Sequence, residues 1–260
     1  MRDIYVAFVW HMHQPVYKDS LTNKYLMPWV RLHATKGYYD MARVLAGFPK
    51  IRQTFNLVPS LLMQIEDYIE GRADDEFLNK SRKPAADLND EDKDFLLSNF
   101  FMANWDTMIK PYPRYWQLLA KRGFRVEDRD FPAVIRSFSE QEMRDLQVFF
   151  NLVWFGYMAR EDFPVIQEMV RKGGNFTEDD KKLVLKTQID VMKALIPLYK
   201  KMQDDGQIEV TASPFYHPIL PLLVDTDIAK RAMPYAPLPE RFTAPDDAAA
   251  QGPTRLQSVE

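Results

Sequence analysis

The stretch IYVAFVWHMHQP, from Ile4 to Pro15, joins a run of β-branched and aromatic residues to a polar end. Ile4 to Trp10 has the composition of a short β-strand, and Pro15 has no N–H to donate to a neighbouring strand. Side chains alternate across a strand, so His11 and, if the extended conformation persists, His13 lie on one face. The stretch therefore predicts a first strand whose carboxyl end presents two imidazoles together.

Two more strands and several helices are predicted downstream. Residues Trp29 to Ala46 place apolar side chains at helical spacing, and Ile51 to Leu57 alternates like a strand before the helical stripe of Leu61 to Glu70. Gln207 to Ala212 alternates as a third strand. Because strands alternate with helices, the sequence favours an α/β fold with a parallel sheet or barrel, in which functional groups gather beyond the carboxyl ends of the strands.

Each predicted strand has one polar face. The second strand carries Asn56 on such a face, and the third strand carries Glu209. If these faces point into one barrel mouth, His11, His13, Asn56 and Glu209 converge from distant segments to form a site. The alternative is that Glu209 lies on a solvated strand edge and Asn56 begins a turn.

The middle of the chain is predicted to be mostly helical, as an insertion over about residues 72–205. Its clearest helical patterns are Glu140 to Ala159 and Glu178 to Met202. Arg72 to Asp94 is rich in charges of both signs and is expected to be an exposed loop, in which Asn89 to Asp92 could start a helix.

Composition excludes several classes of protein. The 260 residues include 34 Lys and Arg against 37 Asp and Glu, for a net charge of −3, which is not typical of a nucleic-acid binder. The absence of cysteine excludes disulfides, thiolate metal sites and thiol nucleophiles. No phosphate-binding glycine loop and no GxSxG motif occurs, so neither a nucleotide-binding enzyme nor a serine hydrolase is indicated.

No segment predicts insertion into a membrane. The first residues lack the cleavage site of a signal peptide, and Leu146 to Ala159 is interrupted by Gln147 and Asn151. That stretch falls short of the ~20 apolar residues that cross a bilayer. We expect a buried helix there, and a soluble, cytoplasmic protein without a membrane partner.

The HxH pair of His11 and His13 also resembles the opening of metal-dependent amidohydrolases, in which two imidazoles on one strand bind a metal. A hydrolytic metal site takes three or more protein ligands, and the chain holds only two further histidines, His33 and His217. Glu209 is the most plausible carboxylate ligand for this alternative. We expect no metal and no cofactor.

Four segments in order along the chain resemble glycoside hydrolase family 57, in its α-amylase and amylopullulanase branch. They are HMHQP (His11 to Pro15), PWVRLHATKGYYDM (Pro28 to Met41), FNLVPSLL (Phe55 to Leu62) and GQIEVTASPFYHPILPLL (Gly206 to Leu223). The resemblance implies an incomplete, seven-stranded (β/α) barrel of the glycoside hydrolase/deacetylase type. It also implies hydrolysis of α-glucans by a retaining mechanism with a Glu nucleophile and an Asp acid/base.

By this resemblance, His11 and His13 of the HxHQP block and Glu209 of the GxxE block line the subsite of the sugar being cleaved. They would bind the substrate without attacking it. Trp29, near a loop, could offer a flat face to a sugar ring, and His217 follows the third strand, where it anchors a loop or touches sugar. Asp225 and Asp227 are expected to be solvated or to act indirectly.

The resemblance places the nucleophile and the acid/base beyond Glu260, so residues 1–260 resemble the amino-terminal part of the catalytic domain, truncated after about three strands. We therefore expect weak or no hydrolysis by this chain alone. The partner implied is an α-glucan polysaccharide or oligosaccharide, not nucleic acid. A noncatalytic α-glucan-binding module derived from such an enzyme is the alternative.

Overall fold

The computed structural model describes residues 4–125 and 131–252, and the chain divides into two compact units. The first unit comprises Met1–Val16, Lys50–Glu66 and Met202–Glu260, and the second comprises Tyr17–Pro49 and Asp67–Lys201. Each unit is therefore built from segments that lie far apart in the sequence.

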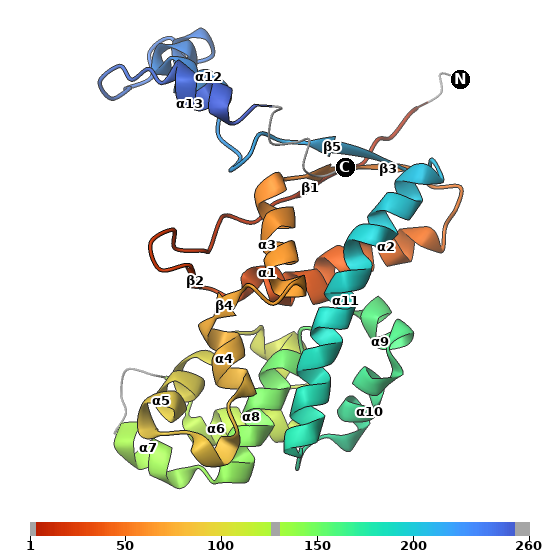
Figure 1. The fold of residues 1–260 in the computed structure, drawn as a ribbon, viewed down its shortest axis with the longest axis vertical. Coiled ribbons are helices and arrows are strands. Elements are labelled where there is room, and N and C mark those ends of the chain that lie inside the picture. Colours follow the sequence, from red (N-terminus) through yellow and green to blue (C-terminus); the bar gives the residue numbers. More distant parts are fainter. Residues whose placement is uncertain (1–3, 126–130, 253–260) are drawn as a thin grey trace. The chain divides into compact units, whose positions relative to one another are not determined.

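A three-stranded parallel sheet forms the centre of the first unit (Figure 1). Its strands, in spatial order, are β1 (Val9–Met12), β3 (Gln53–Leu57) and β5 (Ile208–Ala212). His11 lies opposite Asn56 in the register, and Asn56 lies opposite Thr211. Because side chains alternate along each strand, residues paired in this way share one face of the sheet. The predicted parallel arrangement is confirmed.

The opposite face of the sheet is mainly apolar, although it also carries Gln53. It carries Met12, Phe55 and Ile208, all of which are buried. Helix α3 (Pro59–Ile69) begins directly after β3, and its buried Leu61 and Ile65 lie about one turn apart. Burial of an aliphatic or aromatic side chain contributes about 1.5–3 kcal/mol, so this face anchors the strands while polar residues occupy the other.

The first strand lies further along the sequence than predicted. The prediction covers Ile4 to Trp10, whereas β1 spans Val9–Met12. The register with β3 begins where Val9 lies opposite Thr54, and the N–H of Thr54 donates to the carbonyl of the preceding residue, Phe8, at 3.0 Å. The apolar composition of Ile4 to Trp10 indicates strand propensity, but the partner strand decides where the ladder forms.

The segment after β5 forms short helices tied together by hydrogen bonds. These are α12 (Leu220–Val224), the 3-10 helix η4 (Thr226–Arg231) and α13 (Pro245–Ala250). The N–H of Ala244, which precedes α13, donates to the carbonyl of Leu223 in α12 at 2.6 Å. Arg241 donates two hydrogen bonds to the carboxylate of Asp225, at 3.0 and 2.7 Å. Helices α12 and α13 therefore lie together, as Figure 1 shows.

The second unit is mainly helical. Its helices are α1 (Trp29–His33), α2 (Tyr39–Ala46), α4 (Glu76–Arg82), α5 (Asp90–Asn99), α6 (Pro113–Arg122), α7 (Phe131–Ser137), α8 (Glu140–Leu152), α9 (Tyr157–Asp162), α10 (Pro164–Lys172) and most of α11 (Glu178–Asp204). Shorter elements are the π-helical η1 (Ala34–Tyr38) and η3 (Trp105–Ile109), the 3-10 helix η2 (Ala85–Asp87), and the parallel pair β2 (Lys24–Tyr25) and β4 (Asp74–Asp75). Among the helices that the structure describes, none is both long enough and apolar enough to cross a membrane.

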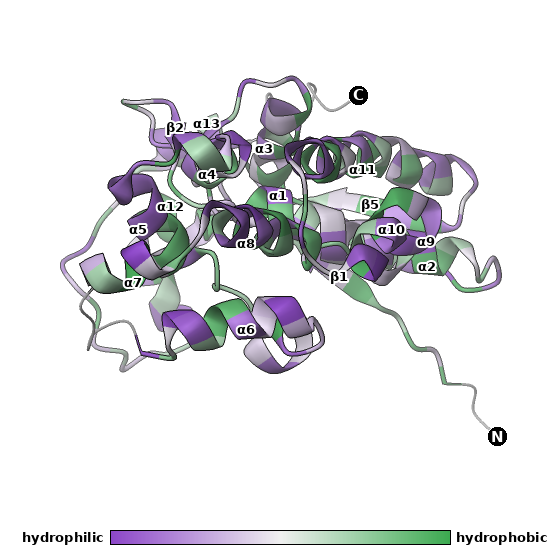
Figure 2. Ribbon diagram, turned by 90° about the horizontal axis from the view of Figure 1, so that it is seen from below, coloured by the Kyte–Doolittle hydropathy of each residue, from purple (hydrophilic) through white to green (hydrophobic). Residues whose placement is uncertain are grey.

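Aromatic side chains around α8 fill the core of the second unit. Phe149 and Phe150 of α8 are completely buried. The ring of Phe150 stacks on Phe100 at 4.2 Å, and the ring of Phe149 stacks on Tyr115 of α6 at 5.3 Å. Figure 2 shows hydrophobic and hydrophilic residues on both α6 and α8, as expected for helices that bury one side.

The segment Arg72 to Asp94 is not the exposed loop that its charge predicts. It contains α4, whose Phe77 and Leu78 are buried. The predicted helix start is confirmed, because Asn89 and Asp92 form a capping box at the beginning of α5. The charged residues of this segment include helix caps, such as Asp75 and Asp92. Composition alone does not distinguish a capping residue from a residue of an exposed loop.

The helix predicted over Glu140 to Ala159 is divided in two. Helix α8 ends at Leu152, and α9 begins at Tyr157, whose N–H donates to the carboxylate of Asp40 at 2.7 Å. A Cβ atom at Gly156 would collide with that carboxylate. The close approach of Asp40 thus requires glycine at position 156. The hydrogen bond from the N–H of Tyr157 to Asp40 caps the new helix that begins there.

Candidate functional site

Two rows of residues cross the polar face of the sheet in the first unit. Within each row, β1, β3 and β5 contribute one residue each. The first row is Val9, Thr54 and Glu209, and the second row, nearer the carboxyl ends of the strands, is His11, Asn56 and Thr211. In this register His11, Asn56 and Glu209 share one face of the sheet.

Asn56 is the centre of a hydrogen-bond network in the second row. Its Oδ1 atom lies 2.7 Å from Nδ1 of His11 and accepts a hydrogen bond from Oγ of Ser213 at 2.9 Å. Its Nδ2 atom donates to Oγ1 of Thr211 at 3.1 Å. These contacts engage both ends of the amide and orient the imidazole of His11, so Nε2 is the nitrogen of that ring with which a ligand can hydrogen-bond.

Three imidazole rings come together near the carboxyl end of β1. The ring centroids of His11 and His217 are 4.5 Å apart, those of His13 and His217 are 4.8 Å apart, and those of His11 and His13 are 5.7 Å apart. We refer to His11, His13 and His217 as the imidazole cluster. The structure thus brings together all three of the histidines predicted to bind substrate.

The environment of His13 favours its neutral form. Partial burial lowers the pKa of His13 below its ordinary value of 6.5, and the charges of His217 and His11 lower it further. A neutral imidazole has one N–H donor and one nitrogen acceptor. His13 can therefore exchange hydrogen bonds with an uncharged polar ligand, such as a hydroxyl group, near neutral pH.

An unusual backbone conformation carries His217 to the cluster. The φ angles of Tyr216 and His217 are +64° and +56°, and non-glycine residues rarely adopt this left-handed region. Each such residue costs about 1–3 kcal/mol and persists only where the surrounding structure holds it, often at functional sites. The N–H of His217 donates to the carbonyl of Pro214 at 3.0 Å, which helps to close this turn.

Glu209 lies on the same face as the imidazole cluster, in the first row. The hydroxyl of Thr54 donates to Oε2 of Glu209 at 3.3 Å, and the Glu209 side chain is otherwise exposed. An exposed carboxylate next to a hydroxyl can accept hydrogen bonds from two further hydroxyl groups. Glu209 therefore adds an acceptor to a face whose other polar groups are amide, hydroxyl and imidazole.

Trp29 belongs to the second unit. Its ring lies 5.8 Å from that of Trp154 and 6.2 Å from that of His33. The buried Nε1 atom of Trp154 has no hydrogen-bond partner among the described residues. The role of Trp29 in binding sugar stays a prediction.

Asp225 has a structural role in the first unit. Its carboxylate accepts a hydrogen bond from the N–H of Asp227 at 3.0 Å, which caps η4, and two more from Arg241. These hydrogen bonds, with that of Arg241 the strongest influence, lower the pKa of Asp225. The contacts engage the carboxylate of Asp225 in holding η4 and its neighbouring segment together.

No group of three or more His, Asp or Glu side chains within residues 4–125 and 131–252 is arranged to hold a metal ion. The alternative of a metal site built on His11, His13 and Glu209 therefore finds no support in the geometry of these side chains.

Sequence reasoning did not single out two polar residues of this face, Thr211 and Ser213. Both contact Asn56. The alternation of the third strand predicts that Thr211 shares a face with Glu209, so its position, though not its contact with Asn56, follows from the sequence. Ser213 lies beyond the end of β5, and its contact depends on the path of the chain after the strand.

The polar face of the sheet gathers imidazole, amide, hydroxyl and carboxylate groups, all of which can form hydrogen bonds with hydroxyl groups. The model of glycosyl hydrolase family 57 matches residues 7–236, and the chain belongs to this family. Its members are glycoside hydrolases, so the ligand class is carbohydrate. Neither the curated proteins nor the solved structures include a match to the chain.

Proposed function

We propose that this chain supplies the substrate-lining part of a glycoside hydrolase that acts on α-glucans of the starch and glycogen type. The observation that carries the proposal is the imidazole cluster, which shares its sheet face with Asn56 and Glu209. The four segments between His11 and Leu223 that resemble this family, in the same order along the chain, support its α-amylase and amylopullulanase branch.

In this proposal the cluster binds one glucose unit through its hydroxyl groups. His11, oriented by Asn56, and the neutral His13 exchange hydrogen bonds with the sugar, and Glu209 accepts from two hydroxyls. Hydrogen bonds to a carboxylate are roughly twice as strong as those between neutral groups. Glu209 therefore contributes most to the orientation of the ring at the bond to be cleaved.

The retaining reaction needs two more groups. A carboxylate attacks the anomeric carbon and an acid protonates the leaving oxygen, with the two carboxyl groups about 5–5.5 Å apart. The two rows on the polar face hold one carboxylate, that of Glu209. We propose that the Glu nucleophile and the Asp acid/base come from beyond Glu260 and that Glu209 binds substrate.

The three strands fit part of a larger (β/α) barrel. Within the described residues, β1 and β5 each pair only with β3, so each has an unpaired edge. The residues leading into β1 are apolar and exposed, with Ile4 at 89% and Tyr5 at 90%. Unpaired edges beside exposed apolar residues are the expected positions of further strands.

Binding of maltotriose, measured by isothermal titration calorimetry, tests the role of the site. We expect His11→Ala and Glu209→Gln to weaken binding at least about tenfold, since the first removes an imidazole and the second removes the charge that strengthens the hydrogen bonds of Glu209. Glu240→Gln changes an exposed carboxylate of the same unit and serves as the matched control. Unchanged affinity in both site variants would contradict the proposal.

An assay of the chain on soluble starch tests the assignment of the catalytic carboxylates. We expect binding without turnover, because general acid catalysis alone contributes about 10²–10⁴ in rate. Turnover at the rate of an ordinary glycosidase would show that the nucleophile and the acid lie within these residues. Binding without turnover is also the expectation for the alternative of a noncatalytic α-glucan-binding module.

A further inference from the structure

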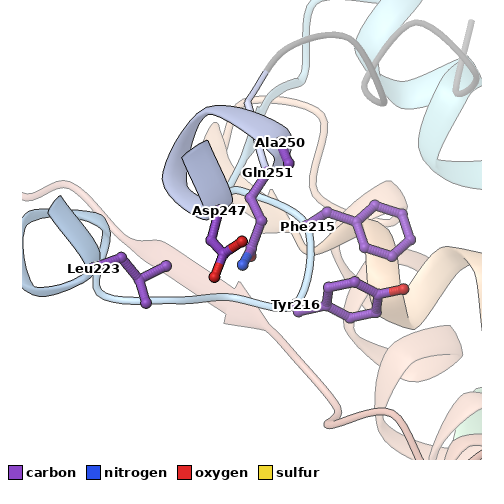
Figure 3. Close-up of a pocket in the computed structure, with 6 residues that line it drawn as sticks. All are labelled: Phe215, Tyr216, Leu223, Asp247, Ala250 and Gln251. Atoms are coloured by element: carbon purple, nitrogen blue, oxygen red, sulfur yellow. The ribbon is translucent and has the colours of Figure 1, made fainter. Parts of the chain in front are cut away.

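A pocket of about 320 Å³ lies in the first unit, next to the segment that carries His217 (Figure 3). It lies between the turn after β5 and the end of α13. Its lining residues are Phe215, Tyr216, Leu223, Asp247, Ala250 and Gln251. The pocket has no role in the function proposed above.

The pocket and the imidazole cluster share one turn of backbone. Tyr216 lines the pocket, and the next residue, His217, belongs to the cluster. Both residues have positive φ angles. In this turn, the side chain of Tyr216 lines the pocket, whereas that of His217 contacts the other imidazole rings. The N–H of Phe215 donates to the carbonyl of Gln251 at 3.4 Å, which ties this turn to the end of α13.

The polar groups of the pocket suit an uncharged ligand with hydroxyl groups. In Figure 3 the side chains of Asp247, in α13, and Gln251, directly after it, extend toward the segment after β5. The Oε1 atom of Gln251 is buried and accepts no hydrogen bond from any residue that the structure describes. A buried acceptor of this kind is costly unless a donor reaches it, and a sugar hydroxyl is such a donor.

The apolar groups of the pocket suit the carbon-bound face of a pyranose. Tyr216 is 52% exposed, and Leu223 adds an aliphatic wall. No Lys or Arg lines the pocket, whereas the carboxylate of Asp247 does. A phosphate or another anion would therefore be repelled, and a neutral sugar is favoured.

We propose that this pocket is a second subsite, which binds one glucose unit of an α-glucan chain while another unit of the same chain occupies the imidazole cluster. The inference rests on the function proposed above. Tyr216 would stack on the ring, and Asp247 and Gln251 would accept hydrogen bonds from its hydroxyls. A glucan spanning both sites would bind more tightly than one that reaches only the cluster.

The test is the dependence of affinity on chain length, measured by titration calorimetry with glucose, maltose, maltotriose and longer maltooligosaccharides. In the unsubstituted chain, we expect affinity to rise as the oligosaccharide becomes long enough to reach the pocket. Tyr216→Ala, Asp247→Asn and Gln251→Ala should each reduce the affinity for the longer oligosaccharides roughly five- to tenfold. They should leave the affinity for the shortest ligand that binds unchanged.

The chain offers close controls for two of these variants. Tyr235, which is 99% exposed, does not line the pocket, and neither does Asp246, the neighbour of Asp247. Tyr235→Ala and Asp246→Asn should therefore preserve the whole length dependence. Because Tyr216→Ala alters a residue with positive φ, the variants Asp247→Asn, in α13, and Gln251→Ala, directly after it, test the pocket without changing the side chains of that turn.

The outcomes separate this inference from the function on which it rests. If no maltooligosaccharide binds the unsubstituted chain, the proposed function fails and the second subsite fails with it. If oligosaccharides bind and His11→Ala weakens all of them, but the pocket variants keep the full length dependence, only the second subsite is overturned. A loss confined to the longer oligosaccharides supports it.

Discussion

Oδ1 of Asn56 lies 2.7 Å from Nδ1 of His11, the residue directly opposite it in the parallel register of β1 and β3. The contact joins two residues that are 45 positions apart in the sequence. It is possible because both strands place their polar residues on one face, with buried Met12 and Phe55 on the other. The pairing thus links the packing of the sheet to the orientation of an imidazole in the candidate site.

Replacing Asn56 should impair ligand binding more than folding. Asn56→Ala removes the contacts to His11, Ser213 and Thr211, and these partners are not fully buried, so water can replace the lost bonds. We expect a loss of about 1 kcal/mol in unfolding free energy and a larger loss in affinity for maltotriose, because the His11 ring is no longer held.

Thermal unfolding and titration calorimetry measure the two effects of Asn56→Ala. Ser213→Ala is a milder variant, since it removes one of the three contacts and leaves the other two. It should retain most of the affinity. The orienting role of Asn56 would be wrong if Asn56→Ala bound maltotriose as tightly as the unsubstituted chain while remaining folded.

The pKa of His13 should respond to its neighbouring histidine. Burial is the largest cause of the lowered pKa of His13, and the charge of His217 is the second. His217→Gln should therefore raise the pKa of His13 toward, but not fully to, 6.5. The measurement is a titration of the imidazole ¹H and ¹³C resonances by NMR.

The same shift predicts how stability depends on pH. The unfolded chain binds a proton at His13 near pH 6.5, whereas the folded chain binds it only at lower pH. Between these values the unfolded state holds more protons, so the free energy of unfolding falls as pH drops below 6.5. His217→Gln should make this decline shallower in denaturant titrations at several pH values, and an unchanged slope would contradict the coupling between the two rings.

Side-chain periodicity was sufficient to predict the polar face of the sheet. Alternation within the strand segments placed His11, Asn56 and Glu209 on faces that the observed register joins. This succeeded because the period of two is a local property of an extended chain.

Features that depend on tertiary contacts could not be predicted from side-chain periodicity. Nothing in the turn SPFYHP predicts positive φ angles at Tyr216 and His217, because neither residue is glycine. The charges of Arg72 to Asp94 suggested a loop, yet buried Phe77 and Leu78 fix a helix there by packing. In both segments, contacts with distant parts of the chain override local preference.

The second unit should depend on a buried ion pair between Arg31 and Asp75, whose side chains are fully buried and 3.1 Å apart. Arg31 also donates from Nη1 to Asn151 at 2.6 Å and to Gln188 at 2.7 Å. Removing one member of such a pair leaves a buried charge uncompensated, so Arg31→Met should cost about 3–5 kcal/mol of unfolding free energy. Urea denaturation followed by circular dichroism measures the loss.

Two further variants serve as controls for Arg31→Met. Adding Asp75→Asn to Arg31→Met removes the orphaned charge and should recover part of the stability. Lys186→Met breaks an exposed ion pair with Asp190 and should cost less than about 1 kcal/mol. Equal losses for Arg31→Met and Lys186→Met would rule out a special contribution of the buried pair.

The exposed apolar segment before β1 should make the chain self-associate. Val6 and Phe8 are 73% and 51% exposed, and among the described residues β1 has a pairing partner on one side only. An unpaired strand edge next to exposed apolar side chains is a template for intermolecular pairing. Val6→Lys combined with Phe8→Lys should shift the chain toward the monomer in multi-angle light scattering, because charges oppose pairing between edges.

Leu21→Lys is the control, since Leu21 is 91% exposed but belongs to no strand. If Leu21→Lys reduces association as much as the double variant does, general surface hydrophobicity, and not the β1 edge, drives the assembly.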